Sequence, residues 1–419
     1  MTRLLTTAEV ARRLDVQPAT VYAYVSRGLL TNVGGRRASR FAQDEVERLV
    51  RRGREGRRPS GAIERIHTGI TLLTADGPAY RGRPVGELLG SSAEAVAHLL
   101  WTGSLGPGEP FRASGELVDV AARAAGALPA AARLVDRLRV AVAAASAVDP
   151  LRHDLDPAAV VRRAETILAL AVDVLARTAP GPGDSATAAA PTDDASALDD
   201  VGRPGGSLAA RLWPALAGHH ATLEQEGLLN GVLVVLADHD LAVSTLAARV
   251  AASARANPYA VVSAGLGALD GPQHGAASTL AHRFLAEALT DPVAALAERL
   301  STGSPIPGFG HRVYRTRDPR AALVLDLLGD GPVRAAVDAV AAPLAGRPDG
   351  FPNVDLGLAA VVHAHDLWPD AGEAIFAVAR TVGWIAHALE EYAEPGLRFR
   401  AEGVYTGPVP DGRPNATLP

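Results

Sequence analysis

Two histidines and one aspartate lie in three short segments whose residues suit acid/base chemistry. His274 is flanked by glycines in GPQHGAAS, His311 follows the loop PIPGFG, and Asp355 ends the segment PNVD. Imidazole and carboxylate groups transfer protons, and glycines let a ligand approach the backbone closely. The three segments therefore predict a reaction centre.

Four arginines follow His311 within nine residues. They are Arg312, Arg315, Arg317 and Arg320. Guanidinium groups bind carboxylates and phosphates through paired hydrogen bonds, so the cluster predicts an anion site beside the acid/base groups. A solvent-exposed basic face is the alternative interpretation.

The role of each group depends on its surroundings. If a helix begins just after His274, its N-terminus favours a neutral imidazole that can donate a hydrogen bond to a carbonyl oxygen. Asp355 is expected to be a base if its side chain is buried, and a helix cap if it is not.

The remaining histidines give weaker signals. By itself, the run Asp238-His239-Asp240 is more typical of a helix face in water than of a binding site. The pairs His219/His220 and His363/His365 have spacings that suit a metal, but no third ligand lies nearby in the sequence, so no metal site is predicted. Five others are interpreted as structural or surface residues: His67, His98, His153, His282 and His387.

Composition limits the possible classes of protein. The chain has 419 residues, more than one hydrophobic core of about 250–300 residues usually holds, so two domains are expected. It has no cysteine, which excludes disulfides, thiolate zinc sites and a cysteine nucleophile. Neither a signal-like start nor an apolar run of about 18 residues is seen, and a cytoplasmic, soluble protein is expected.

The N-terminal segment has the pattern of a small helical module. Residues 6–9 (TTAE) form a capping-box pattern before a short helix, and Pro18 suits the first turn of a second helix. Gly34-Gly35 signals a hairpin turn, and a third helix is expected over about 43–52. The pattern resembles the winged helix-turn-helix of the MerR and excisionase families.

Charge separates this module from the rest of the chain. Residues 1–60 carry 13 arginines against 6 acidic residues, net +7, whereas the remainder is net −12. We assign 1–54 to the module and the charged, apolar-poor residues 55–62 to a linker.

A basic helix-turn-helix module predicts DNA binding, with the second helix in the major groove and the wing arginines on phosphates. The candidate contact residues are Thr20, Tyr22, Arg27, Arg36, Arg37 and Arg40. A relic or protein-contact module, whose arginines merely face water, is the alternative.

The body of the chain is dominated by alanine, leucine and valine at helical spacings, as in 93–100, 131–145 and 160–176. Hardly any stretch alternates as a strand does, so an all-α fold is predicted. Residues 180–206, rich in small residues with proline and glycine, are expected to form a flexible loop.

Seven segments resemble the citrate synthase family in sequence and in order. They are IERIHTGITLLTADGPAYRG, ADHDLAVSTLAARV, GALDGPQHGAAS, PGFGHRVYRTRDPRA, PNVD, ARTVGWIAHALEE and FRAEGVYTGP. The resemblance implies a body over 63–419, with a large helical domain (about 63–265 and 376–419) and a small one (about 266–375) that close over the substrates. It also implies a homodimer and the condensation of an acyl-CoA with oxaloacetate, followed by thioester hydrolysis, with no metal or redox cofactor.

The same resemblance assigns roles to single residues. Asp355 matches the base that removes a proton from the acyl methyl group, His274 the group that stabilises the enol, and His311 the acid that protonates the oxaloacetate carbonyl. The dicarboxylate ligands match His239, Arg320 and Arg380, and Arg400 matches the arginine that reaches into the partner subunit's site. The CoA contacts match Pro305, Ile306, Gly308, Arg315 and Asn353.

Three positions depart from the family pattern and leave the substrate open. Ala276 replaces a usual glycine, Ser278 stands where asparagine is common, and Ala242 stands where asparagine is frequent. Acetyl-CoA is the first expectation, giving citrate, and propionyl-CoA is the near rival, giving 2-methylcitrate. A DNA-binding sensor of oxaloacetate or CoA esters, built on the same body, is a third hypothesis from another class.

Overall fold

The structure is a computed structural model that describes residues 4–14, 18–26, 30–34, 39–43, 45–46, 66–179 and 206–399. The chain divides into two compact units between His67 and Thr68. Arg400 and the predicted linker lie outside the described residues, as do 180–205 of the predicted flexible loop.

The first unit contains β1 (Leu4–Thr6), α1 (Thr7–Leu14), α2 (Pro18–Ser26) and β2 (Arg40–Ala42). The predicted capping box is present, since the Glu9 carboxylate accepts 2.8 Å hydrogen bonds from the N–H and the hydroxyl of Thr6. Strand β1 pairs antiparallel with β2, with Leu5 opposite Phe41. The sequence did not reveal β1, because three residues are too few to show alternation.

The core of this unit includes Val10, Val21 and Phe41, none of which is exposed. Of the DNA-contact candidates, Tyr22 is 54% exposed on α2, while Thr20 and Arg40 are half-buried. The other three candidates lie outside the described residues: Arg27, Arg36 and Arg37.

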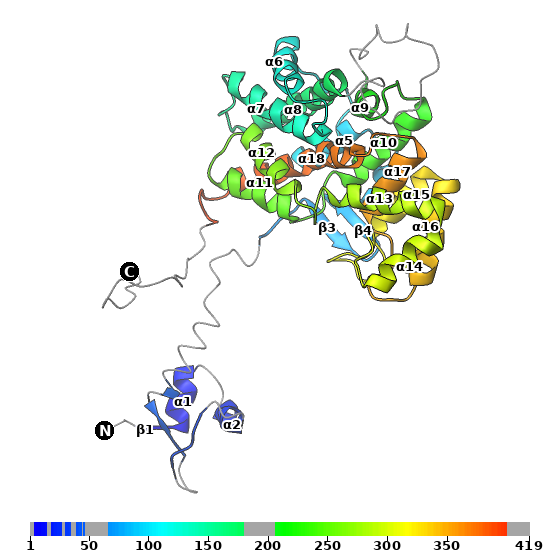
Figure 1. The fold of residues 1–419 in the computed structure, drawn as a ribbon. Coiled ribbons are helices and arrows are strands. Elements are labelled where there is room, and N and C mark those ends of the chain that lie inside the picture. Colours follow the sequence, from blue (N-terminus) through cyan, green and yellow to red (C-terminus); the bar gives the residue numbers. More distant parts are fainter. Residues whose placement is uncertain are drawn as a thin grey trace, which may run out of the picture. The chain divides into compact units, whose positions relative to one another are not determined.

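The second unit is helical, which confirms the all-α prediction (Figure 1). Its helices are α4 (Val85–Leu88), α5 (Ala93–Thr102), α6 (Gly115–Gly126), α7 (Leu134–Val148), α8 (Pro157–Thr178), α9 (Leu208–Ala217), α10 (Leu223–Leu236), α11 (Val243–Ser253), α12 (Pro258–Leu269), α13 (Ala277–Thr290), α14 (Pro292–Thr302), α15 (Pro319–Leu328), α16 (Pro332–Ala341), the 3-10 helix η2 (Ala342–Leu344), α17 (Val354–Ala364) and α18 (Ala371–Ala393). A small antiparallel sheet of β3 (Thr71–Thr74), β4 (Gly77–Tyr80) and β5 (Arg83–Pro84) was not predicted.

Two hydrophobic cores lie in this unit. The larger involves α5 to α12 and α18, and the long helix α18 runs through its middle (Figure 1). The smaller is formed mainly by α13, α14, α16 and α17. The predicted boundaries of the large and small domains stay a prediction. Among the described residues, no helix is long and apolar enough to cross a membrane.

Candidate functional site

Six of the predicted site residues converge in the second unit, although they come from five separate segments. His239 follows α10, His274 lies in the turn before α13, His311 and Arg320 flank the loop into α15, Asp355 lies in the first turn of α17, and Arg380 is in α18. The charges of Arg320 and Arg380 reach His239, His274 and Asp355 alike.

His274 is held by a neighbouring hydroxyl. Its Nε2 lies 2.7 Å from the Ser244 Oγ, and its ring meets Phe376 edge-on. Burial lowers the pKa of His274 to about 4, assisted by the charges of Arg380 and Arg320. The ring is therefore neutral at pH 7 and can donate a hydrogen bond, as the sequence predicted, with burial as the main cause.

His311 accepts hydrogen bonds at Nδ1 from the backbone N–H groups of Val313 and Tyr314, at 3.1 and 3.3 Å. Burial and Arg320 lower the pKa of His311 to about 4. A neutral ring with an acceptor at Nδ1 carries its proton on Nε2. The Arg320 Nη2 lies 3.1 Å from Nε2, so the guanidinium charge stands beside this edge of the ring.

His239 lies in a turn whose conformation is held by buried hydrogen bonds. The Asp238 carboxylate accepts hydrogen bonds from the Thr71 hydroxyl at 2.5 Å and from the Asp240 N–H at 3.1 Å. Asp240 has a φ of 53°, which non-glycine residues rarely adopt. His239 is only 6% exposed, and burial lowers its pKa well below the ordinary value.

Helix α18 passes this turn at very close range. The Gly383 N–H donates to the Ala237 carbonyl at 3.0 Å, and a Cβ at Gly383 would lie 2.6 Å from that oxygen. Alanine at 383 should lower the free energy of unfolding by about 2–3 kcal/mol, as overpacking does, and displace His239. Thermal unfolding and oxaloacetate binding measure the two effects.

The matched control is Gly227→Ala in α10, where nothing lies within 4 Å of an added Cβ. That substitution should be neutral or slightly stabilising, because alanine favours helix. Equal stability of the two variants would show that the crossing of α18 tolerates a methyl group.

Arg320 is held by the carboxylate of Asp318, which no sequence motif indicated as a site residue. Asp318 accepts from the Arg320 Nε at 3.0 Å and Nη2 at 2.8 Å, and from the Val354 N–H at 3.1 Å. Both side chains of the pair are almost fully buried. Asp318 thereby joins the start of α15 to the start of α17, and its place before Pro319 as an N-cap was the available signal.

Arg380 is 1% exposed and donates from Nε to the Leu236 carbonyl at 3.0 Å. Its guanidinium lies over the Phe376 ring, 4.5 Å from the centroid. Within the described part of the chain, its buried Nη2 has no hydrogen-bond partner. Burial lowers the pKa of Arg380 to about 10, so the group stays charged at pH 7 and offers a free donor.

Asp355 is not a helix cap, because Asn353 caps α17 by accepting from the Asp355 N–H at 3.0 Å. The Asp355 side chain is half-buried. Burial raises the pKa of Asp355 to about 6, against the opposing effect of Arg320. A carboxylate with this pKa suits proton abstraction near neutral pH.

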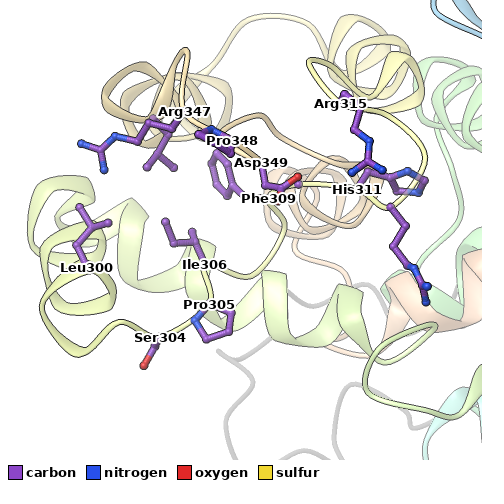
Figure 2. A pocket seen from close by; sticks show the side chains of 14 residues that line it. Leu300, Ser304, Pro305, Ile306, Phe309, His311, Arg315, Arg347, Pro348 and Asp349 are labelled. Atoms are coloured by element: carbon purple, nitrogen blue, oxygen red, sulfur yellow. The ribbon is translucent and has the colours of Figure 1, made fainter. Parts of the chain in front are cut away.

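A pocket of about 660 Å³ lies next to His311, between the loop before it and the turn after η2 (Figure 2). Three predicted CoA contacts line it: Pro305, Ile306 and Arg315. Figure 2 shows Arg347 at one end and Arg315 with His311 at the other. Arg347 was missed, because its RPDG context is also typical of a plain turn.

The other two predicted CoA contacts do not line this pocket but shape its wall. Gly308 has a φ of 82°, and a Cβ there would lie 2.7 Å from the Leu356 Cβ. Asn353 holds the backbone of the loop 308–310 in place. Its N–H donates to the Gly308 carbonyl at 2.8 Å, and its Nδ2 donates to the Gly310 carbonyl at 2.9 Å.

The remaining histidine pairs do not form metal sites in the described residues, where no group of three or more His, Cys, Asp or Glu is suitably placed. His363 stacks on His282 with 4.0 Å between ring centroids, and His365 packs edge-on against Trp213.

Comparison with known proteins gives two family matches. The family "Citrate synthase, C-terminal domain" matches residues 63–401, and the family "Helix-turn-helix domain" matches residues 4–54. The chain is 31% identical to the citrate synthase of Haloferax volcanii over 381 residues, which cover 83% of this chain and 97% of the relative. It is 32% identical to the citrate synthase of Acidithiobacillus ferridurans over 219 residues, 49% of this chain and 56% of that relative.

Solved structures share the fold. The citrate synthase of Pyrobaculum aerophilum superposes with a TM-score of 0.67 at 25% identity, over 83% of this chain and 91% of that one. The citrate synthase of Thermoplasma acidophilum, solved as a ternary complex with carboxymethyl coenzyme A and oxaloacetate, gives a TM-score of 0.67 at 23% identity, over 84% and 96%.

Proposed function

The chain belongs to the citrate synthase family of enzymes, and from that premise we propose that it condenses acetyl-CoA with oxaloacetate and hydrolyses the product thioester to citrate and CoA. The observation that carries the proposal is one buried cationic donor: within the described chain, the Arg380 Nη2 has no hydrogen-bond partner. The charge of Arg320 acts on the same site, where its Nη2 lies 3.1 Å from the His311 Nε2. A 2-oxo dicarboxylate supplies an acceptor oxygen for Arg380 and negative charge for both arginines.

The proposed reaction begins with a proton transfer. Asp355 removes a proton from the methyl group of the acetyl thioester, while His274 donates a hydrogen bond to the thioester oxygen that becomes the enol oxygen. Ser244 occupies the His274 Nε2, so the donated proton is on Nδ1. Base and donor must act together, because the methyl proton of a thioester is only weakly acidic.

The enol carbon then attacks the carbonyl carbon of oxaloacetate, and the carbonyl oxygen takes the proton from His311. Water hydrolyses the resulting thioester and releases CoA. The pocket beside His311 suits the CoA moiety, because Arg312, Arg315 and Arg347 place positive charge around it. The proposed reaction uses the CoA thioester as a substrate and needs no further cofactor.

Thiol release tests the proposal directly. Acetyl-CoA or propionyl-CoA is incubated with and without oxaloacetate, and a chromogenic disulfide reagent detects free CoA. The chain has no cysteine, so it adds no background. Oxaloacetate-dependent release is expected, and its absence in a folded protein would overturn the proposal. Faster release from propionyl-CoA would identify a 2-methylcitrate synthase instead.

The pH profile follows from Asp355. The base must be ionised, and its pKa is about 6, so kcat/KM should fall tenfold per pH unit below about 6. His274, with a pKa of about 4, stays neutral through that range. Steady-state rates between pH 4.5 and 8 check this, and a profile flat down to pH 4.5 would remove Asp355 as the base.

The exposed face of α11 supports the homodimer. Val243, Leu246 and Val250 lie on it at helical spacing and are 66%, 40% and 45% exposed. A second copy that covers this apolar stripe would remove it from water. We propose that Arg400 then reaches the partner subunit's site.

The N-terminal unit supports a second function, DNA binding, because residues 4–54 match the helix-turn-helix family and residues 1–60 are net +7. Electrophoretic retention of duplex DNA should weaken steeply between 50 and 200 mM salt if arginines hold phosphates. Retention that is absent, or independent of salt, would contradict this role.

A further inference from the structure

Tyr314 contacts two proposed ligands of oxaloacetate, His239 and Arg320, and the proposed acid, His311. Its hydroxyl lies 3.1 Å from the His239 Nε2, and its ring centroid lies 5.1 Å from that of His311. The Arg320 guanidinium carbon lies over the ring, 5.7 Å from the centroid. The side chain is 6% exposed, so these contacts are made away from bulk water.

The hydroxyl bond joins segments that are 75 residues apart in sequence. His239 comes from the turn after α10, in the larger core, whereas Tyr314 lies in the loop between His311 and α15. Among the described residues, no other side-chain hydrogen bond reaches the His239 ring. The hydroxyl therefore sets the rotation of that ring.

Both partners of this bond are uncharged over the working pH range. Burial raises the pKa of Tyr314 to about 12, and burial lowers that of His239 well below its usual value. The hydrogen bond therefore joins two neutral groups, and neither group changes its charge near pH 7. It occupies one ring nitrogen of His239 and leaves the other to a ligand.

We propose that Tyr314 is a positioning residue for oxaloacetate: its hydroxyl holds the His239 ring in the orientation from which that ring binds the dicarboxylate. The inference rests on the proposed function. Tyr314 contacts His239, His311 and Arg320 at once. The loop 311–318 would therefore contribute to the specificity for a 2-oxo dicarboxylate.

The test is Tyr314→Phe, which keeps the ring and removes only the hydroxyl. KM for oxaloacetate should rise about tenfold, the upper end of what one neutral hydrogen bond contributes, with kcat within about twofold. KM for acetyl-CoA should stay unchanged, and the melting temperature should fall only slightly, because the buried His239 Nε2 loses its partner. An unchanged KM for oxaloacetate, or equal rises for both substrates, would overturn the proposal.

The matched control is Tyr259→Phe in α12, a buried tyrosine whose hydroxyl lies 3.1 Å from the Asp149 Oδ2. It should lose stability and keep both KM values. A merely structural Tyr314 would behave in the same way. In a His239→Gln background, Tyr314→Phe should cause no further loss, and additive losses would refute the coupling.

Calorimetric titration of oxaloacetate separates this inference from the proposed function. If wild type binds oxaloacetate but releases no CoA, a tenfold weaker Kd for Tyr314→Phe still supports the positioning role while the condensation fails. If wild type neither binds oxaloacetate nor releases CoA, both proposals fall.

Discussion

Replacing Asp355 with asparagine should lower kcat for oxaloacetate-dependent CoA release by about 10³-fold, within the range of 10²–10⁴ that general bases contribute. The amide has the shape of the carboxylate but cannot take the methyl proton. The cap of α17 is retained, because Asn353 provides it. Steady-state kinetics at pH 8 measure the loss, and a kcat within threefold of wild type would contradict the assignment.

Stability at two pH values separates lost chemistry from lost structure. The folded-state pKa of Asp355 is about 6, above the value of an unfolded chain. Its contribution to stability is therefore full below the unfolded pKa and is lost as pH rises through about 6. Asp355→Asn should melt at a higher temperature than wild type at pH 8, and this difference should vanish near pH 4.

A remote aspartate gives the control. Asp156 is the N-cap of α8 and accepts from the Ala158 N–H at 3.0 Å. Asparagine caps helices as well as aspartate does, so Asp156→Asn should change neither kcat nor the melting temperature. A loss of activity there would show that the assay responds to any change of charge.

Replacing Arg320 with methionine should have the second large effect, on stability and on oxaloacetate binding together. It leaves the Asp318 carboxylate buried without its cation, which costs about 3–5 kcal/mol of unfolding free energy. It also removes a proposed carboxylate ligand, so saturation with oxaloacetate should be lost. Chemical denaturation and titration calorimetry measure the two losses.

Arg163→Met is the matched control, since Arg163 also pairs with a largely buried carboxylate, Asp149, at 2.7 Å. It should reduce stability and leave KM for oxaloacetate unchanged. Adding Asp318→Asn to Arg320→Met should restore part of the stability, because the uncompensated charge is then gone. No restoration would show that the loss has another cause.

The residues with predicted chemical roles could be found in the sequence because each lies in a short motif. His274, His311 and Asp355 are marked by the glycines and prolines beside them. The structure puts all three within reach of the charge of Arg320, and His274 and Asp355 also within reach of that of Arg380. Their roles stay predictions. The D-H-D run was ambiguous, because nothing local shows whether Asp238 faces water or, as the structure has it, a buried turn.

The residues that position these catalytic candidates could not be found from short sequence motifs. The contact of Tyr314 with His239 depends on how a loop and a helix end pack, and local spacing carries no information about it. The sheet β3–β5 was missed because its strands have two to four residues, too few for alternation. The departures at Ala242 and Ala276 prove to be helix N-caps without a side-chain bond.

The tight crossing at Gly383 fixes the spacing between two of the site residues. Helix α18 carries Arg380, and its contact with Ala237 ties that arginine to the turn of His239, so the two cannot shift against each other. They form a fixed frame on the larger core, whereas the loop and pocket residues around His311 belong beside the smaller one. A ligand that binds Arg380 and His239 together would therefore meet two groups whose spacing does not depend on the position of the loop around His311.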